Sequence, residues 1–224
     1  MFDRLNMKNF NYIIKEFIRR SPTLLFITRW ILDCIRYLNA NSKWKSIVNK
    51  DEIKLELGSG TKKGLNGWTT VDRNGADISW DLGKGFPLPN DCVTKIYSSH
   101  LLEHIPYQQL ILFLKECVRV LKPDGEFSVC VPDARLVVDC YITGKLISEK
   151  NTWWQPGMVD TGSKIDQLNY LAYMGDQHKY MFDKENLINT LLISGFKSAN
   201  LRKFDQELDM IERDRVSIYA VAKK

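Results

Sequence analysis

The sequence predicts an α/β protein with a mostly parallel sheet and helices on both of its faces. From Asp51 onward, patterns typical of β-strands alternate with patterns typical of helices. Hydrophobic residues make up 44% and charged residues 26% of the chain, a composition typical of folded globular proteins and unlike that of disordered ones. Before Asp51 the strand pattern is missing. We therefore predict a helical extension over residues 1–50 and one α/β domain over residues 51–224.

Two amphipathic helices are predicted in the extension. Apolar residues recur at helical spacing over residues 10–20. Ser21 and Pro22 then provide an N-cap and a first-turn proline for a second helix over residues 23–39. Residues 1–50 hold ten Lys and Arg against three Asp and Glu, a net charge of +7, whereas the remainder holds 22 against 24, a net charge of −2.

The basic amphipathic pattern of residues 10–40 leaves several contacts open. These residues can pack on the α/β domain or on a second copy in a homodimer, dock on an anionic membrane surface, or cover a substrate site. No stretch reaches the roughly 18 uninterrupted apolar residues of a membrane span. The main domain lacks a basic stripe with interleaved aromatic residues, so we expect no nucleic acid partner.

The five cysteines are scattered and form no CxxC pair, which is typical of free thiols in a reducing compartment. We therefore expect a cytoplasmic protein, with peripheral contact to the inner face of the membrane as an alternative.

Seven strands are predicted in the domain, and helices connect several of them. The strands are Ile53–Leu57, Trp68–Val71, Asp77–Trp80, Val93–Ser98, Glu126–Val131, Ala199–Phe204 and Val216–Ala222. The helices run from about His100, with a new start at Pro106, to Leu121, and over Ala134–Thr143 and Lys184–Ser194. Lys122–Gly125 is a predicted turn, and residues 144–180 are predicted to be an irregular, acceptor-binding insertion.

Glycines and acidic residues follow the first strands of the predicted sheet. Gly58-Ser59-Gly60 follows the first strand, and Asp72 and Asp81 stand at the ends of the second and third. Ligands bind beyond the carboxyl ends of parallel strands, where glycines let the backbone approach a ligand and a carboxylate accepts both hydroxyls of a ribose. The order of these residues predicts a nucleotide-like cofactor at this edge.

The sequence resembles the class I S-adenosylmethionine-dependent methyltransferases from about Lys54 to Ala222. The nearest subgroup is the small methyltransferases of bacterial surface-polysaccharide gene clusters. The resemblance implies a Rossmann-like methyltransferase sheet whose last strand is antiparallel. It is carried by LELGSG at Leu55–Gly60, by SSHLLEHI at Ser98–Ile105 and by RVLKPDG at Arg119–Gly125, together with Asp72 and Asp81.

The resemblance also implies a role for each matching residue toward S-adenosylmethionine, whose product is S-adenosylhomocysteine. Glu56, Gly58, Ser59 and Gly60 are expected at its methionine half, together with Ser99 and His100 under the carboxylate and sulfonium. Asp72 is expected at the ribose, and Asp81 and Leu82 at the adenine. The short connection at Thr61–Gly67 departs from the family, whose first crossover usually holds a helix.

Three residues are candidates for the general base that a sugar hydroxyl requires. They are His100, Asp133 and His178, with an N-cap role as the alternative for Asp133. The acceptor is expected to be a sugar or a nucleotide- or phosphate-linked sugar. Aromatic and basic residues that could contact it are Trp153, Trp154, Tyr170, Tyr173, Arg135 and Lys145.

Rival interpretations concern the metal and the acceptor. His100, Glu103 and His104 fit the HxxEH pattern of zinc peptidases, but the segment follows a parallel strand within the methyltransferase motif, so we expect no metal. Methylation of a quinone or another small metabolite is the alternative within the enzyme class. A cofactor-binding module without catalysis is the alternative outside it.

Overall fold

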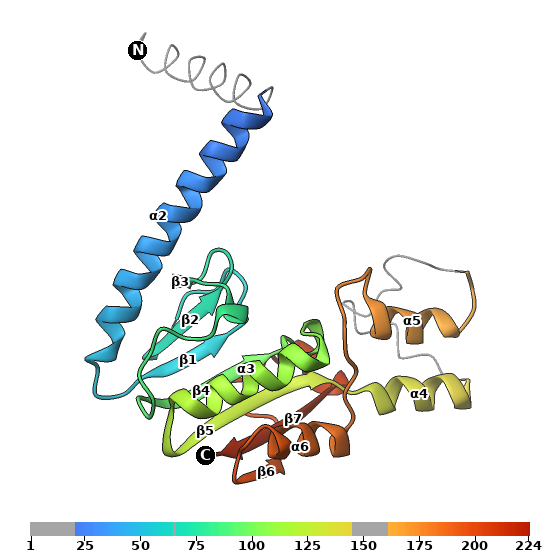
Figure 1. The fold of residues 1–224 in the computed structure, drawn as a ribbon. Helices are drawn as coiled ribbons and strands as arrows, with labels where there is room; N and C mark the ends of the chain where they lie inside the picture. Colours follow the sequence, from blue (N-terminus) through green and yellow to red (C-terminus); the bar gives the residue numbers. More distant parts are fainter. Residues whose placement is uncertain (1–20, 65, 145–160) are drawn as a thin grey trace, which may run out of the picture. The chain divides into compact units, whose positions relative to one another are not determined.

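The computed structural model describes residues 21–64, 66–144 and 161–224, and the chain divides into two units, Met1–Lys43 and Trp44–Lys224 (Figure 1). Each unit is described by itself. The helix predicted over residues 10–20 lies outside the described residues. The domain boundary predicted at residue 50 stays a prediction.

Helix α2 spans Pro22–Val48 and is longer than the predicted helix, which ended at residue 39. Its start agrees with the N-cap prediction, since the Leu24 N–H donates to the Ser21 hydroxyl at 3.4 Å. The helix continues because Ala40, Trp44 and Ile47 extend the helical spacing of apolar residues. Among the described helices, none is both long and apolar enough to cross a bilayer.

The domain is built on a seven-stranded sheet with the order β3-β2-β1-β4-β5-β7-β6. Strands β1 to β5 pair in parallel, and β7 is antiparallel to both of its neighbours. This topology confirms the predicted fold class, including the antiparallel last strand. The strands are β1 Lys54–Leu57, β2 Trp68–Asp72, β3 Ile78–Ser79, β4 Val93–Ser99, β5 Leu121–Pro132, β6 Ser198–Leu201 and β7 Ser217–Lys223.

Helices pack on this sheet and at its end (Figure 1). Helix α3 contacts β5, α6 lies beside β6 and β7, and α4 contacts α5. Short 3₁₀ turns, η1, η2 and η3, connect several elements. The α-helices are α3 Tyr107–Val120, α4 Ala134–Thr143, α5 Ile165–Tyr173 and α6 Lys184–Ile193, and the turns are η1 Leu82–Lys84, η2 Leu102–His104 and η3 Ile211–Val216.

Three predicted elements need correction. The helix expected from about His100 is the 3₁₀ turn η2, followed by α3 after Pro106. The stretch expected to be irregular, residues 144–180, contains α5, which ends at Met174 in a left-handed conformation. Lys122–Gly125 turns as predicted, but it does so as a bulge inside β5. There, Leu121 pairs with Val93 and Glu126 already pairs with Lys95.

Aromatic side chains fill one part of the domain core. Trp44, in the last turns of α2, is 1% exposed, and its ring packs edge-on against Trp80 and Phe86 with ring centroids 6.1 and 6.2 Å apart. Its indole N–H is buried without a hydrogen-bond partner among the described residues. Packing of the rings therefore carries the stabilisation at this position.

A buried ion pair contacts strands β4 and β5. The Arg202 guanidinium donates to both oxygens of Asp209, at 2.5 and 2.8 Å, and its Nε donates to the Ser128 hydroxyl at 2.8 Å. The Tyr97 hydroxyl donates to Asp209 at 3.0 Å. The Asp209 side chain is fully buried, so these donors replace the water that the carboxylate loses on folding.

The connection between β1 and β2 contains no helix among its described residues, as the sequence predicted. The Asp77 carboxylate holds it in place. One carboxylate oxygen accepts from the Gly64 N–H at 2.7 Å and from the Thr70 N–H and hydroxyl at 3.1 and 2.9 Å. Partial burial raises the pKa of Asp77, but these donors together outweigh it and keep the pKa below its ordinary value.

Asp77→Ala is expected to lower the free energy of unfolding by about 2–3 kcal/mol, because it removes the charged acceptor of three hydrogen bonds. A lowered folded-state pKa contributes stability above the unfolded-state pKa, and that contribution is lost as the pH falls through the folded-state pKa. Urea unfolding at pH 7 and at pH 3 measures both effects. If the difference in free energy of unfolding between wild type and variant is as large at pH 3 as at pH 7, the charge of Asp77 does not contribute to stability.

Candidate functional site

The carboxyl ends of the parallel strands meet at one edge of the sheet. Leu57 of β1 pairs with Val71 on one side and with Ser98 on the other. Asp72 pairs with Ser79 at the end of β3. The register therefore brings the segments that follow β1, β2, β3 and β4 together, as expected for a ligand site of a parallel sheet.

The glycine loop after β1 is tied to the end of β2. The Gly58 N–H donates to the Val71 carbonyl and the Gly60 N–H donates to the Asp72 carboxylate, both at 2.9 Å. Gly58 has a φ of +70°, and a Cβ there would lie 2.9 Å from the Leu101 side chain. Glycine is therefore required at this position both by conformation and by space.

Two other predicted cofactor residues are Glu56 in β1 and Ser59 in the glycine loop. The Glu56 carboxylate pairs with the Lys62 ammonium at 2.9 Å. The Ser59 hydroxyl is buried and has no hydrogen-bond partner among the described residues. A buried hydroxyl without a partner is unfavourable, and a bound ligand with polar groups would satisfy it.

A cavity of about 390 Å³ lies beside these strand ends. Asp72 and Asp81 line its polar part, and Leu101, Ile105 and Phe113 line its apolar part. Leu82 lines the cavity as well, and the Asp81 carboxylate accepts from the Gly83 N–H at 3.1 Å, which caps η1. This size and mixture of walls suit a ligand of nucleoside dimensions. We refer to this space as the strand-end cavity.

A smaller cavity of about 140 Å³ adjoins it, and His104 lines both. Its walls combine titratable side chains with the apolar side chains of Pro132, Leu171 and Met174, and they come from the segment after β4, the end of β5, α5 and the loop after it, and η3. We refer to this space as the histidine cavity. Its lining includes His100, Glu103, His104, Tyr170, His178 and Arg213.

Glu103 is the most unusual residue of the histidine cavity. The residue is 2% exposed, and neither carboxylate oxygen has a hydrogen-bond partner among the described residues. The His100 Nδ1 lies 3.5 Å from one of these oxygens. Burial raises the pKa of Glu103 to about 8. The main chain of Glu103 also positions the loop after α5, because the N–H groups of Lys179 and Tyr180 donate to its carbonyl.

The imidazole rings of His104 and His178 pack edge to face at this cavity. Their ring centroids are 4.8 Å apart, with the rings nearly perpendicular. The Nδ1 of His104 lies 3.2 Å from the Gln177 carbonyl and that of His178 lies 2.6 Å from the Leu171 carbonyl. A carbonyl only accepts, so each Nδ1 carries the proton and each Nε2 carries the lone pair. Burial lowers the pKa of both rings, which are therefore neutral at pH 7.

His100 plays a different structural part. It follows β4 with a φ of +52°, and its Nε2 lies 2.9 Å from the Ser217 hydroxyl of β7. Burial, followed by the charge of Arg213, lowers the pKa of His100 to about 3. His100 and His104 do not share a helix face, because residue 100 precedes η2. The pairing that the HxxEH pattern requires is therefore absent from these two residues.

Two other predicted site residues, Ser99 and Asp133, differ in whether they contact the cavities. Ser99 accepts a hydrogen bond from the Arg213 guanidinium at 3.1 Å, so it borders the histidine cavity through that residue. Asp133 lines neither the strand-end cavity nor the histidine cavity. Its carboxylate caps α4 by accepting from the N–H groups of Arg135 and Leu136, which is the alternative that the sequence left open.

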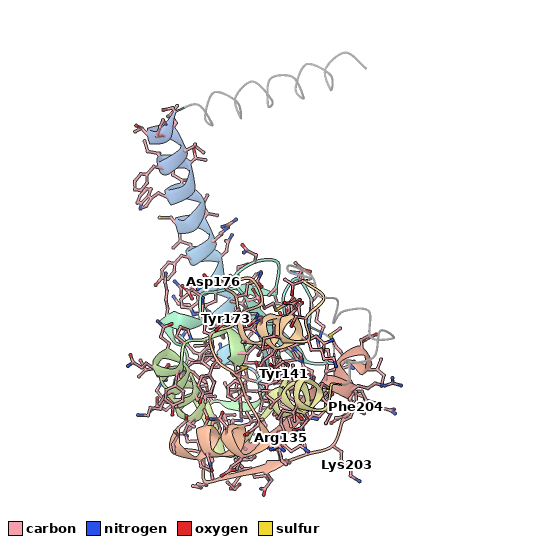
Figure 2. All side chains as sticks on the ribbon, turned by 90° about the vertical axis from the view of Figure 1, so that its right-hand side faces the viewer. Arg135, Tyr141, Tyr173, Asp176, Lys203 and Phe204 are labelled. Atoms are coloured by element: carbon pink, nitrogen blue, oxygen red, sulfur yellow. The ribbon has the colours of Figure 1, made fainter. Side chains whose placement is uncertain are left out.

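The aromatic and basic acceptor candidates mostly lie outside the histidine cavity. Tyr170 lines it, whereas Tyr173 is 63% exposed and Arg135 pairs with Asp139 on the surface of α4. Figure 2 shows Arg135 and Tyr173 on the side of the domain that carries α4 and α5. Three further candidates, Trp153, Trp154 and Lys145, lie outside the described residues.

The sequence analysis did not assign a catalytic or binding role to Glu103, His104 or Arg213. The signal for the first two was present in SSHLLEHI, but it was considered only as a peptidase-like pair with His100. Arg213 lies in η3, far from any motif in the sequence. Its place beside Ser99 depends on the antiparallel return of β7, which no local pattern encodes.

Part of the chain matches a known protein family. Residues 55–129, about a third of the chain, match the family described as "Methyltransferase domain". This segment runs from β1 into β5 and includes Asp72, Asp81 and the Glu103–His104 pair. The match supports the predicted methyltransferase and S-adenosylmethionine as its cofactor. No curated protein matches the sequence.

Solved structures of similar fold include an S-adenosylmethionine-dependent methyltransferase from Mesorhizobium loti. It is 17% identical, with 82% of this chain and 96% of that chain covered and a TM-score of 0.46. A 1,6-didemethyltoxoflavin N1-methyltransferase from Burkholderia thailandensis is 12% identical, with 83% and 76% covered and a TM-score of 0.47. A candidate O-methyltransferase from Nostoc punctiforme is 14% identical with a TM-score of 0.46. The match covers 83% of this chain but only 56% of that one.

Proposed function

From the methyltransferase domain at residues 55–129, we propose that this protein transfers a methyl group from S-adenosylmethionine to an oxygen of a small acceptor. The observation that carries the proposal is the pair of adjoining cavities that share His104. One cavity lies beside the acidic strand ends that the sequence predicts for the nucleoside part. The other is lined by titratable side chains and is the place for the acceptor.

The strand-end cavity suits the nucleoside part of the donor. One Asp72 oxygen accepts from the Gly60 N–H, and the second oxygen is available for the ribose hydroxyls. Leu82 and Phe113 provide apolar surface for the adenine ring. The buried Ser59 hydroxyl lies in the loop predicted for the methionine half. S-Adenosylmethionine supplies an activated methyl group, and the residues of the chain align it with the acceptor.

The histidine cavity suits an acceptor that must lose a proton. When a hydroxyl oxygen forms its bond to the methyl carbon, the bond between that carbon and the donor sulfur breaks, and the hydroxyl proton leaves. A hydroxyl has a pKa far above 7, so the reaction needs a group that accepts this proton or weakens the O–H bond. The cluster of Glu103, His104 and His178 is the group that this cavity offers.

The titratable side chains of this cavity favour a hydroxylated acceptor. Hydroxyl groups can pair with the imidazole nitrogens and with the Glu103 carboxyl, and Arg213 can meet a phosphate. This supports a sugar or sugar-phosphate acceptor, and the resemblance of SSHLLEHI and RVLKPDG to the surface-polysaccharide subgroup points to a glycan precursor. A quinone would pair with fewer of these polar groups and would rely on the apolar side chains of Pro132, Leu171 and Met174, which also line the cavity.

The proposal extends to where the enzyme works. A glycan precursor is available in the cytoplasm and at the inner face of the membrane, and the basic residues 10–40 suit an anionic surface or a second copy of the chain. Vesicle binding and the oligomeric state of the full chain decide between these two contacts.

Titration with S-adenosylhomocysteine by calorimetry tests the donor site. We expect binding by the wild type, and Asp72→Ala should weaken it by about 1–3 kcal/mol, because a charged hydrogen-bond partner is removed. Asp139→Ala, which removes an exposed aspartate of α4, is the matched control and should bind as the wild type does. Equal affinity of all three proteins would contradict the role of Asp72.

A methylation assay then distinguishes an enzyme from a module that only binds the cofactor. Binding of S-adenosylhomocysteine without methylation of any sugar, sugar phosphate or quinone in a screen would favour a module without catalysis. Methylation of a quinone but of no sugar would favour the alternative acceptor.

A further inference from the structure

We propose that Glu103, His104 and His178 form a binding site for one divalent metal ion, with a donor set that suits Zn²⁺. Two imidazoles and one carboxylate are the ligand types of zinc sites that keep an open position for a water or a substrate. The proposal replaces the expectation that the protein holds no metal. It also differs from the HxxEH interpretation, because His178 and not His100 provides the second imidazole.

The three side chains are already close together. One ligand atom from each residue lies within 4.8 Å of the other two. Atoms bound to one zinc ion at about 2.1 Å lie at most about 4 Å apart, so small rotations of the side chains complete the site. The residues come from two distant segments of the chain, η2 and the loop after α5. The bonds from the Lys179 and Tyr180 N–H groups to the Glu103 carbonyl hold these segments together.

The buried carboxylate of Glu103 is an independent sign of a missing partner. It is almost completely enclosed, and both of its oxygens have no hydrogen-bond partner among the described residues. Burying a polar group in this way is costly unless it is paired or binds a metal. A divalent cation between Glu103 and the two imidazoles would displace the carboxyl proton and provide the missing partner.

The two histidines are oriented as metal ligands usually are. In metal sites, the ring nitrogen that does not bind the metal donates to a carbonyl or carboxylate, which fixes the tautomer. Here the Leu171 and Gln177 carbonyls accept from the two Nδ1–H groups. Both Nε2 atoms therefore keep their lone pairs for a metal.

A role in catalysis follows if the proposed function is correct. Three protein ligands leave an open position, and the histidine cavity is the space into which it opens. An acceptor hydroxyl bound there would release its proton to solvent more readily, because a metal ion stabilises the oxyanion. Glu103, His104 and His178 would then act as ligands, and none of them as the general base. Metal binding itself does not depend on this role.

The experiment is a metal titration of the full chain after treatment with a chelator. Zn²⁺ is added in a calorimeter, and Co²⁺ is added while visible absorption is recorded. We expect one ion per chain, with a cobalt spectrum of nitrogen and oxygen ligation. His178→Ala and Glu103→Gln should each weaken binding of both ions at least tenfold.

A control addresses the cysteines, because thiolates are also ligands for Zn²⁺ and Co²⁺. In a variant with Cys34, Cys92 and Cys140 replaced by serine, the three cysteines that are not fully buried, we expect unchanged metal binding. Circular dichroism checks that each variant folds. A second readout needs no variant, since Zn²⁺ should raise the melting temperature of the wild type.

Several results would overturn the proposal. They are the absence of binding by the wild type, equal affinity in the wild type and both ligand variants, and loss of binding in the cysteine variant. Titration of the same metal-free protein with S-adenosylhomocysteine separates this proposal from the proposed function. Zinc binding without S-adenosylhomocysteine binding would leave the metal site in place and reject the transferase, and the reverse result would do the opposite.

Discussion

Asp209→Ala is expected to lower the free energy of unfolding by about 3–5 kcal/mol, because it leaves the largely buried Arg202 side chain without its carboxylate. The carboxylate is the common acceptor of Arg202, Tyr97 and the Asp205 N–H. These groups join β4, the chain after β6 and the segment before η3, so the loss affects three parts of the domain. Burial, followed by the negative charge of Asp209, also raises the pKa of Tyr97 above its ordinary value.

Urea unfolding at pH 7 measures the effect, and a double-mutant cycle assigns it to the pair. Arg202→Met alone should also be strongly destabilising, since it leaves a buried carboxylate. The double variant Arg202→Met/Asp209→Ala should be more stable than the sum of the two single effects predicts. Strictly additive effects, or a loss below 1 kcal/mol for Asp209→Ala, would show that the pair contributes little.

Trp44→Ala is expected to cost about 3–5 kcal/mol, the range observed when a buried aromatic side chain is removed from a core. Trp44 is 1% exposed and packs against two aromatic rings, Trp80 and Phe86. Its indole N–H makes no hydrogen bond with the described residues, so the whole effect should come from packing.

Trp44→Phe provides the matched control. It keeps an aromatic ring and removes only the indole N–H and part of the volume, so its cost should be well below that of Trp44→Ala. Thermal and urea unfolding of the two variants compare them directly. A loss of stability in Trp44→Phe as large as in Trp44→Ala would show that the N–H, and not the ring, is what the position needs.

Most of the fold could be predicted because the periodic signals are local. The predicted strand Ile53–Leu57 matches β1 to within one residue, and the predicted helix Ala134–Thr143 has the same bounds as α4. Helix α5 was missed because it has nine residues and lies among turn-forming ones. The end of α2 was placed too early because Trp44 and Ile47 are separated from the main apolar stripe by polar residues.

The candidate site could be predicted where a residue directly follows a parallel strand. Asp72, Asp81 and Leu82 stand at or just after strand ends, and the edge at which parallel strands end is known once the strands are known. These three residues line the strand-end cavity. Asp133 shows the limit of this reasoning, since an aspartate after a strand caps a helix as readily as it faces a ligand. The grouping of Glu103 with His178 depends on a loop after α5, and no local pattern in the sequence specifies that loop's path.

Among the residues that the structure describes, His104 is the one that borders both the strand-end cavity and the histidine cavity. If the donor and the acceptor occupy these two cavities as proposed, any change in acceptor affinity that donor binding causes through this imidazole is matched by an equal change in donor affinity when the acceptor binds. A substitution at this one ring would then alter the binding of both substrates.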